Sequence, residues 1–216
     1  IGGVIGLFFF GWAVLCEKFA VGNVCYALIG AAIPLMISGG FHVDGYMDTM
    51  DAFHSYQSRE KKLEILKDSH IGAFAAIMLA LYYMIDIAAI SEIHTQKAVS
   101  ALAAVFFLAR CFSGIAVMTL QPAKKEGLLY TFASSAQKVR VKAALYFQTV
   151  LCVVLMLLVS GWYGAAAIGA ALLSFFYFKK KSYKELGGIT GDTAGFFVTV
   201  CEAAAAAAVA VAGYFL

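Results

Sequence analysis

Three aspartates lie within eight residues of a strongly apolar chain, in the stretch GGFHVDGYMDTMDAF at 39–53. Asp44, Asp48 and Asp51 are spaced i, i+4, i+7, which places them in one narrow stripe if the segment is helical. Three like charges on one stripe repel, and a hard cation with oxygen ligands would relieve that repulsion. The spacing therefore predicts a catalytic Mg²⁺ site, with a solvated acidic helix face as the alternative.

The residues beside this triad shape the predicted site. Gly39 and Gly40 follow an apolar run and are expected to break the helix that the run forms, while Gly45 would let another backbone approach closely. His42 has ring nitrogens that are too soft to be good Mg²⁺ ligands. We therefore predict a substrate contact for His42, through hydrogen bonding or proton transfer, with an ordinary loop histidine as the alternative.

Two polar segments farther along suit a phosphorylated substrate. Asp68 opens the turn DSHIG, where it would either cap the next helix or support the metal. The stretch GGITGD at 187–192 leads into the last apolar run, and glycines at a helix N-terminus leave backbone N–H groups accessible to an anion. We predict phosphate or metal contacts for Gly188, Gly191 and Asp192. An ordinary capped helix start is the alternative, and the Walker lysine spacing is absent.

Basic residues complete the predicted site. Arg110 lies inside an apolar run, about 10 residues or roughly 15 Å from the nearer polar loop. An arginine at membrane depth is costly and marks a functional position. It would clamp a diphosphate or pair with an acid, for which Asp86 and Glu202 are available. Lys124 and Lys125 follow in the next polar loop and are predicted to contact substrate.

The composition shows which elements must position these groups. Of the 216 residues, 62% are hydrophobic and 13% are charged, and the mean hydropathy is +0.85. A helix needs about 20 apolar residues to cross a bilayer, and membrane-embedded segments must satisfy their own backbone. The apolar runs that approach or meet this length are 1–16, 19–38, 71–90, 98–120, 141–160, 162–178 and 193–216. They predict one all-α, multi-pass membrane domain over 1–216 with about seven transmembrane helices, preceded in the native protein by a further N-terminal segment.

The basic residues also predict an orientation. If the helices alternate in direction, the polar loops 39–70, 121–140 and 179–192 share one side. All Lys and Arg except Lys18, Lys97 and Arg110 lie in these loops or directly beside them. The positive-inside rule then puts this side, with the candidate site, in the cytoplasm of a bacterium whose inner membrane holds the chain.

Four segments together resemble a known family. FHVDGYMDTMDAF, LKDSHIG (66–72), Arg110 followed by QPAKKEGLL (121–129), and GGITGDTAG (187–195) are similar, in order and spacing, to the motifs of the cobalamin synthase, or adenosylcobinamide-GDP ribazoletransferase, family. The resemblance runs from about residue 35 to 202. Two departures are that His70 stands where the family usually has a basic residue, and that the family's N-terminal arginine-proline motif is missing.

This resemblance implies the last step of cobalamin (vitamin B12) nucleotide-loop assembly. In that step α-ribazole, or its 5′-phosphate, displaces GMP from adenosylcobinamide-GDP in a Mg²⁺-dependent transfer of a substituted phosphate. Asp44, Asp48, Asp51, Asp68 and Asp192 would be the metal ligands. The expected partners are these substrates and the lipid bilayer, not nucleic acid, and a homo-oligomer or a complex with other cobalamin-assembly enzymes is left open.

Two other functions compete with this interpretation. A CDP-alcohol phosphotransferase also uses aspartates and metal, but its pattern resembles DGxxAR followed by GxxxDxxxD. Here Asp44 and Gly45 are followed by Tyr46 and Met47, without that arginine. A cation transporter would place its polar groups near the middle of the membrane with internal symmetry. This chain crowds its acids at one interface and shows no repeat, which favours the enzyme.

Overall fold

The computed structural model describes residues 1–124 and 138–215, and this part of the chain is built from nine α-helices without a β-strand. The helices are α1 (Gly2–Lys18), α2 (Asn23–Ser38), α3 (Phe41–His54), α4 (Arg59–Ile65), α5 (Ala73–Ile90), α6 (Gln96–Thr119), α8 (Lys138–Ser160), α9 (Trp162–Leu186) and α10 (Gly191–Gly213). The predicted all-α class is confirmed.

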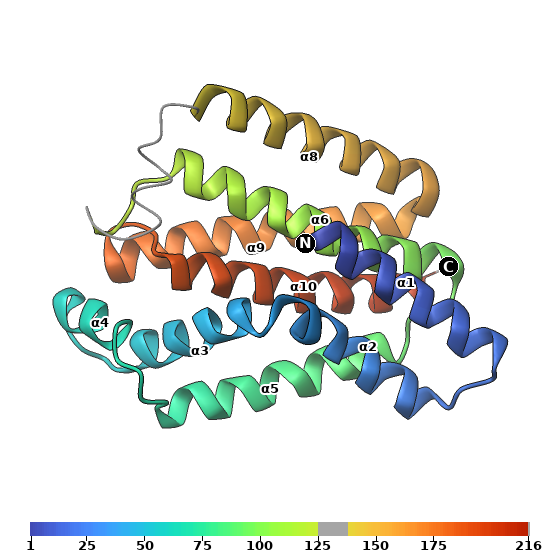
Figure 1. Cartoon of the computed structure of the whole chain (residues 1–216), viewed down its shortest axis with the longest axis horizontal. Coiled ribbons are helices and arrows are strands. Elements are labelled where there is room, and N and C mark those ends of the chain that lie inside the picture. The colour runs from blue at the N-terminus through green and yellow to red at the C-terminus, as the bar shows by residue number, and fades with distance from the viewer. Residues whose placement is uncertain (125–137, 216) are drawn as a thin grey trace.

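The long helices run side by side along the molecule, with α10 in the middle and α8 at one edge (Figure 1). α10 packs against α9, α3, α6 and α5. Of the residues in an apolar 18-residue stretch of α10, 72% are buried, against 17% for the corresponding stretch of α8. The short helix α4, the start of α5 and the start of α10 lie at the same end of the bundle. The α1–α2, α5–α6 and α8–α9 connections lie at the other end.

Several of these helices are suited to a membrane. Within the described residues, α5, α6, α8 and α10 are each long and apolar enough to cross a bilayer, and the bent pair α2 and α3 counts as a fifth span if taken together. The protein is therefore a helical membrane protein. The larger number, about seven, stays a prediction.

The segment predicted as a polar loop over 39–70 is the main correction to the fold. Gly39 and Gly40 do end α2, with φ of 66° and 81°, but the chain then turns by 96° into α3. One face of α3 is buried and carries Tyr46, Met50 and Phe53. Burial of this face stabilises a helix although the opposite face bears the aspartates. The predicted loop over 179–192 was likewise too long, because α9 continues to Leu186.

Aromatic contacts fix α3 against α10. The ring of Tyr46 stacks on that of Phe196 at 5.9 Å between centroids, and Phe53 meets Phe196 edge-on at 5.7 Å. The Tyr46 hydroxyl also donates to the carbonyl of Met78 on α5, at 3.0 Å. Such pairs add to the burial of the rings themselves. The helix that bears the aspartates is thus held by both of its neighbours.

Candidate active site

The aspartates of α3 meet the N-terminal turn of α10 at a close backbone contact. A Cβ atom added to Gly45 would lie 2.8 Å from the Asp192 carbonyl oxygen, and one added to Gly195 would lie 3.0 Å from the His42 carbonyl oxygen. Neither position has room for a side chain unless the helices shift. The two glycines therefore allow the close approach predicted for Gly45, and they bring Asp192 to the aspartates of α3.

Four carboxylates gather at this contact. Asp44, Asp51 and Asp192 each lie close enough to Asp48 for their charges to act on it, and Lys124 acts on Asp192. Neither Asp44 nor Asp48 forms an ion pair with any side chain in the described ranges. In the same part of the chain, no three His, Cys, Asp or Glu side chains converge closely enough to form a ready-made metal site. The result is a concentration of negative charge in which no described residue places a cation on Asp44 or Asp48.

Asp51 has a different environment from the other two members of the triad. Its two carboxylate oxygens accept hydrogen bonds from the backbone N–H groups of Gly72, at 2.7 Å, and Ala75, at 2.8 Å. These are N–H groups at the start of α5, which have no partner within their own helix. Gly72 must lack a side chain, because a Cβ there would lie 2.5 Å from the Asp51 Oδ1. Asp51 thus caps α5 and ties it to α3, and its predicted metal role stays a prediction.

Asp68 does not cap α5, contrary to one of its two predicted roles. Its Oδ1 accepts hydrogen bonds from the His70 backbone N–H at 3.0 Å and from Nδ1 of the same residue at 2.6 Å, and both side chains are exposed. These bonds hold the pKa of the Asp68 carboxyl below its ordinary value. The cap comes from Asp51 because α5 begins at Ala73, beyond the reach of the turn at Asp68. A metal role for Asp68 stays a prediction.

The glycine-rich segment divides into a structural half and an accessible half. Gly188 lies against residues 121–123, where Ala123 N–H donates to the Ile189 carbonyl at 2.8 Å and Ile189 N–H donates to the Gln121 carbonyl at 3.0 Å. A Cβ at Gly191, by contrast, would meet no described atom within 4 Å.

Two threonines cap the N-terminus of α10. Thr190 and Thr193 form a reciprocal capping box, so Asp192 is not the cap, and Thr193 takes part from inside the helix. The Thr190 hydroxyl also donates to Asp192 Oδ2 at 3.3 Å. The carboxylate of Asp192 is therefore left for the charge cluster. The predicted contacts of Gly188, Gly191 and Asp192 with phosphate or metal stay predictions.

Lys124 joins the polar loop after α6 to this end of the bundle. Its Nζ donates to the Leu63 carbonyl on α4 at 2.7 Å, and its charge acts on Asp192. The loop segment that it starts is therefore fixed beside the cluster. Lys125, the other predicted contact in this loop, lies outside the described residues.

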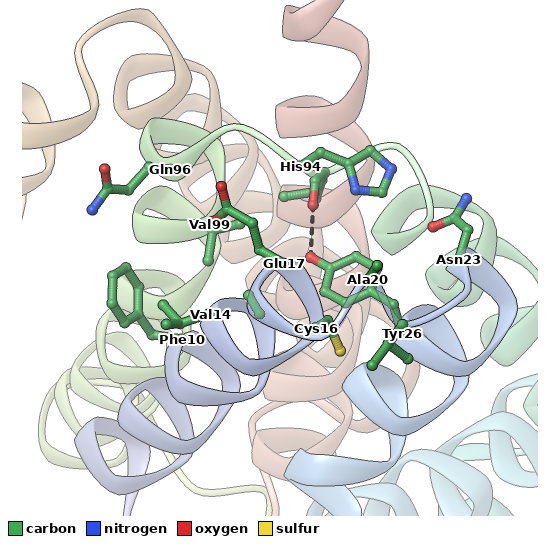
Figure 2. A pocket seen from close by; sticks show the side chains of 13 residues that line it. Phe10, Val14, Cys16, Glu17, Ala20, Asn23, Tyr26, His94, Gln96 and Val99 are labelled. Carbon is green, nitrogen blue, oxygen red and sulfur yellow. Dashed lines mark hydrogen bonds between the residues drawn. The ribbon is translucent and has the colours of Figure 1, made fainter.

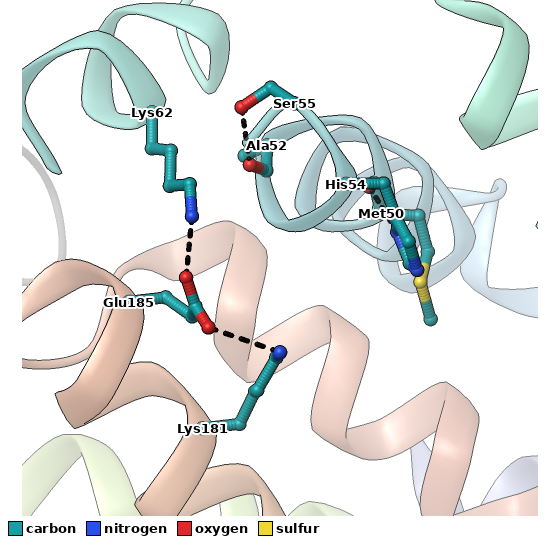
Figure 3. Close-up of polar contacts among 7 residues, drawn as sticks. All are labelled: Met50, Ala52, His54, Ser55, Lys62, Lys181 and Glu185. Atoms are coloured by element: carbon teal, nitrogen blue, oxygen red, sulfur yellow. Dashed lines mark hydrogen bonds and ion pairs between the residues drawn. The ribbon is translucent and has the colours of Figure 1, made fainter. Parts of the chain in front are cut away.

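A largely buried ion pair between Lys62 and Glu185 holds α4 onto α9, and Lys181 of α9 also bonds to Glu185, as Figure 3 shows. Lys62 Nζ lies 2.5 Å from Glu185 Oε2, and Lys181 Nζ lies 3.1 Å from Glu185 Oε1. Lys181 also sits 5.4 Å from the centre of the Phe53 ring at the end of α3. Hydrogen bonds to Lys62 and Lys181 lower the pKa of the Glu185 carboxyl, which lies beyond the apolar part of α9. These basic residues thus do more than set the membrane orientation.

Arg110 lies deeper in the bundle and is paired. Its guanidinium forms an ion pair with Glu202 of α10, and it donates to the Phe106 carbonyl at 2.9 Å. Glu202, not Asp86, is therefore the partner among the two acids that the sequence offered. His42 lies within electrostatic range of Arg110, and its Nδ1 is buried without a hydrogen-bond partner among the described atoms. The predicted contacts of Arg110 and His42 with substrate stay predictions.

Two cavities, at different places in the bundle, differ in whether they adjoin the aspartates. One, of about 550 Å³, lies at the α1–α2 end and is lined by Glu17, Tyr26 and His94, with the Tyr26 hydroxyl bonded to the Ile93 carbonyl (Figure 2). It contains no aspartate of the cluster. The other, of about 590 Å³, lies between the start of α3 and α5 and includes Asp44 in its wall. Only the second cavity adjoins the candidate site.

The wall of this second cavity includes residues that the sequence did not single out. Met47 follows Asp44 by three positions and so lies on the same side of α3, a signal that the spacing contained. Leu79 and Tyr83 come from α5, and no local pattern connects them with the aspartates. Glu202, which pairs with Arg110, was considered only as one of two acids.

Comparison with known proteins agrees with the family resemblance of the sequence motifs. Residues 1–210 match the model of the family described as cobalamin-5-phosphate synthase. The chain is similar to proteins named adenosylcobinamide-GDP ribazoletransferase from three organisms. That of Lachnoclostridium phytofermentans is 42% identical over 98% of this chain and 81% of its own length. That of Clostridium botulinum strain Eklund 17B is 34% identical over 94% and 80%, and that of Escherichia coli strain K12 is 28% identical over 94% and 79%.

No solved structure matches the chain. The family match covers all four motifs on which the sequence resemblance was based, from the aspartate triad to the glycine-rich segment. It also disfavours the CDP-alcohol phosphotransferase and transporter alternatives. The chain belongs to the cobalamin-5-phosphate synthase family.

Proposed function

We propose that this chain joins α-ribazole, or its 5′-phosphate, to adenosylcobinamide-GDP and releases GMP, the final step of cobalamin nucleotide-loop assembly. The observation that carries this proposal is the family match over residues 1–210, together with the shared name of its relatives. The carboxylate cluster supports the chemistry, because transfer of a phosphoryl-type group relies on positioning and on neutralisation of charge.

The proposed reaction exchanges a phosphoanhydride bond for a phosphate ester bond. A ribose hydroxyl that is free in both α-ribazole and its 5′-phosphate attacks the phosphorus attached to cobinamide, so a new P–O ester bond forms as the anhydride P–O bond to GMP breaks. GMP leaves with the electron pair of that bond, and the hydroxyl proton passes to a base. Asp44 or Asp48 would accept it through an oxygen that does not bind metal, since neither carboxylate is paired with a cation from the described part of the chain.

The donor set suits Mg²⁺ at Asp44, Asp48 and Asp192, although these side chains would have to draw closer together on binding, since no three described His, Cys, Asp or Glu side chains form a ready-made metal site. All three offer the hard oxygen donors that Mg²⁺ prefers, and their mutual repulsion would be relieved by a cation. Asp51 is less suited, since both of its oxygens accept backbone N–H bonds, and Asp68 is exposed and bonded to His70. Bound Mg²⁺ would neutralise charge on the diphosphate oxygens.

The remaining groups would hold the phosphates in place. Lys124 is fixed beside Asp192 and offers a cation for a phosphate oxygen. The accessible backbone at Gly191 lies at the N-terminus of α10, where the helix dipole favours an anion. Asp51 and the Arg110–Glu202 pair would act indirectly, since they fasten α5 to α3 and α6 to α10. The basic loops at this end support an inner-membrane orientation with the site facing the cytoplasm.

The proposal is tested with the protein purified in detergent and reconstituted in liposomes. Adenosylcobinamide-GDP, α-ribazole and Mg²⁺ are added, and both GMP and the corrinoid product are measured. GMP release that requires both substrates and stops with EDTA is the expected result. Failure to form GMP, or GMP formed equally well without α-ribazole, would overturn the proposal. Retained activity after removal of divalent metal would overturn the metal site alone.

A further inference from the structure

The cavity beside Asp44 is mostly apolar and opens where α2 turns into α3. Gly39 and Gly40 turn the chain by 96° at this point, and a Cβ at Gly39 would meet no described atom within 4 Å. Figure 1 shows that α3 does not continue the line of α2. The cavity lies between the first turn of α3 and α5. We call this space the α3–α5 groove. Its wall includes Leu35, Asp44, Met47, Leu79 and Tyr83.

The charge of the groove determines which part of a substrate it can take. Among the described residues that line it, Asp44 is the one charged side chain. A phosphate or diphosphate would be repelled by that carboxylate and would lose hydration against leucine and methionine side chains. Phosphate groups are better placed on the other side of Asp44, toward Asp192, Lys124 and the start of α10. The groove therefore suits an uncharged group attached to a ligand whose reacting end lies at the aspartates.

The size and polarity of the groove further restrict which uncharged group it can bind. The groove, at about 590 Å³, is in the range that accommodates small organic ligands. The corrin macrocycle with its side chains is much larger than such a ligand. Guanine has a polar edge that needs several hydrogen-bond partners, and apart from Asp44, which belongs to the carboxylate cluster, the described lining supplies chiefly Ser38 and Tyr83. The base of ribazole is a flat and largely apolar aromatic ring, which matches Leu35, Met47 and Leu79.

We propose that the α3–α5 groove binds the aromatic base of α-ribazole and directs the ribose toward Asp44. This inference rests on the proposed function, since it requires α-ribazole as a substrate. The wall of the groove contains Asp44, and Asp44 belongs to the carboxylate cluster. A base seated in the groove therefore brings the attacking ribose hydroxyl to the cluster from the Asp44 side, while the diphosphate of the second substrate occupies the Asp192 side.

A tryptophan in the groove tests the assignment. Leu79→Trp fills the space from the α5 side, and Leu81→Trp makes the same change on the same helix at a side chain that is 45% exposed and lines no described cavity. We expect Leu79→Trp to raise the KM for α-ribazole by about tenfold or more, with the KM for adenosylcobinamide-GDP little changed. Leu81→Trp should leave both values near those of the wild type.

A smaller residue provides a second test that does not depend on tolerance of tryptophan. Leu79→Ala enlarges the groove, so it should improve kcat/KM for a ribazole analogue with a bulkier fused ring relative to α-ribazole itself. A rise in the KM for adenosylcobinamide-GDP instead, or an unchanged KM for α-ribazole in folded Leu79→Trp protein together with unchanged preference in Leu79→Ala, would overturn the inference.

Equilibrium binding separates this inference from the proposed function. α-Ribazole alone is titrated into detergent-solubilised wild-type, Leu79→Trp and Leu81→Trp proteins, whose folding is checked by circular dichroism. Binding that only Leu79→Trp weakens supports the groove even if the wild type releases no GMP, in which case the transfer reaction alone fails. GMP release by the wild type with equal α-ribazole binding by all three proteins would overturn the groove and leave the transferase intact.

Discussion

Helix α10 carries two acids in contrasting environments. Asp192 lies in its first turn, in a cluster with the carboxylates of α3, whereas Glu202 lies about 15 Å farther along and is neutralised by Arg110. Both acids face a neighbouring helix. One contact gathers like charges and the other pairs opposite charges, although the same helix supplies an acid to each.

The cluster at Asp192 is therefore suited to bind a ligand, whereas the pair at Glu202 stabilises the helix bundle. Like charges held together by helix packing are unfavourable until a cation or a proton relieves them. A buried ion pair is compensated from within, and removal of one partner leaves an unpaired charge. The charge cluster is therefore the candidate for metal and substrate, and the Arg110–Glu202 pair joins α6 to α10.

The largest predicted effect comes from neutralising a member of the cluster. Asp48→Asn should lower kcat/KM by at least about 100-fold, because it removes a carboxylate suited to proton transfer and metal binding. Asp51→Asn is the matched control one turn away. It should cost about 1 kcal/mol of stability through loss of one capping bond to α5, with activity within about tenfold of the wild type.

GMP release measured over a range of Mg²⁺ concentrations checks both variants, with thermal unfolding in detergent as the measure of stability. Asp48→Asn should also need more Mg²⁺ for half-maximal activity, whereas Asp51→Asn should not. If folded Asp51→Asn protein lost as much activity as Asp48→Asn, the three aspartates would act as one unit, as their spacing alone predicts.

The next largest effect comes from unpairing the deeper charges. Glu202→Leu leaves the guanidinium of Arg110 buried without its partner, at a cost of about 3–5 kcal/mol. Replacing both residues, as Arg110→Met with Glu202→Leu, should recover most of that loss, because apolar side chains of similar size can replace a buried pair. Unfolding by SDS titration in mixed micelles measures the stability of each variant.

The activity of the double variant then sharpens the comparison between the two charge groups. Turnover per folded molecule should fall far less than in Asp48→Asn, since the cluster of α3 and α10 remains intact. A loss as large as that of Asp48→Asn would place Arg110 among the groups that contact substrate. A double variant no more stable than Glu202→Leu would contradict the structural role of the pair.

The sequence predicted what depends on local patterns. Apolar runs and the two glycines at 39–40 indicated the helices and the break before the aspartates. The helical stripe of the triad is also real, yet the segment was predicted to belong to a polar loop because its aspartates lowered the hydropathy. Tyr46, Met50 and Phe53 have the same i, i+4, i+7 spacing on the opposite face, and that spacing is a signal for a helix buried on one side.

Contacts between residues that are far apart in the chain could not be predicted from this single sequence. Arg110 and Glu202 are 92 positions apart, and Lys62 and Glu185 are 123 apart. Capping of α5 was one of the two roles predicted for Asp68, but the cap comes from Asp51 on another helix. Such roles depend on how helices pack, and composition and spacing do not determine that packing.

The smallest effect concerns the ion pair at the same end as the cluster. Lys62→Met removes one of the two lysines bonded to Glu185 and should cost about 1–2 kcal/mol, since Lys181 remains as a partner. Lys61→Met is the matched control, because Lys61 pairs with Glu64 at an exposed position and such pairs contribute little. Unlike the cluster, this pair should affect stability much more than turnover.

The pH dependence of stability provides the sharper measurement. The folded-state pKa of Glu185 is lowered, chiefly by its hydrogen bond with Lys62, so the unfolded state binds the extra proton as the pH falls below the ordinary value of 4.5. The pair therefore contributes fully above that pH, and its contribution is lost as the pH falls through the lowered folded-state pKa. The difference in stability between wild type and Lys62→Met should shrink over that window, while Lys61→Met should follow the wild type. A difference that stayed constant down to strongly acidic pH would mean that Lys62 stabilises α4 through packing of its methylene chain and not through its charge.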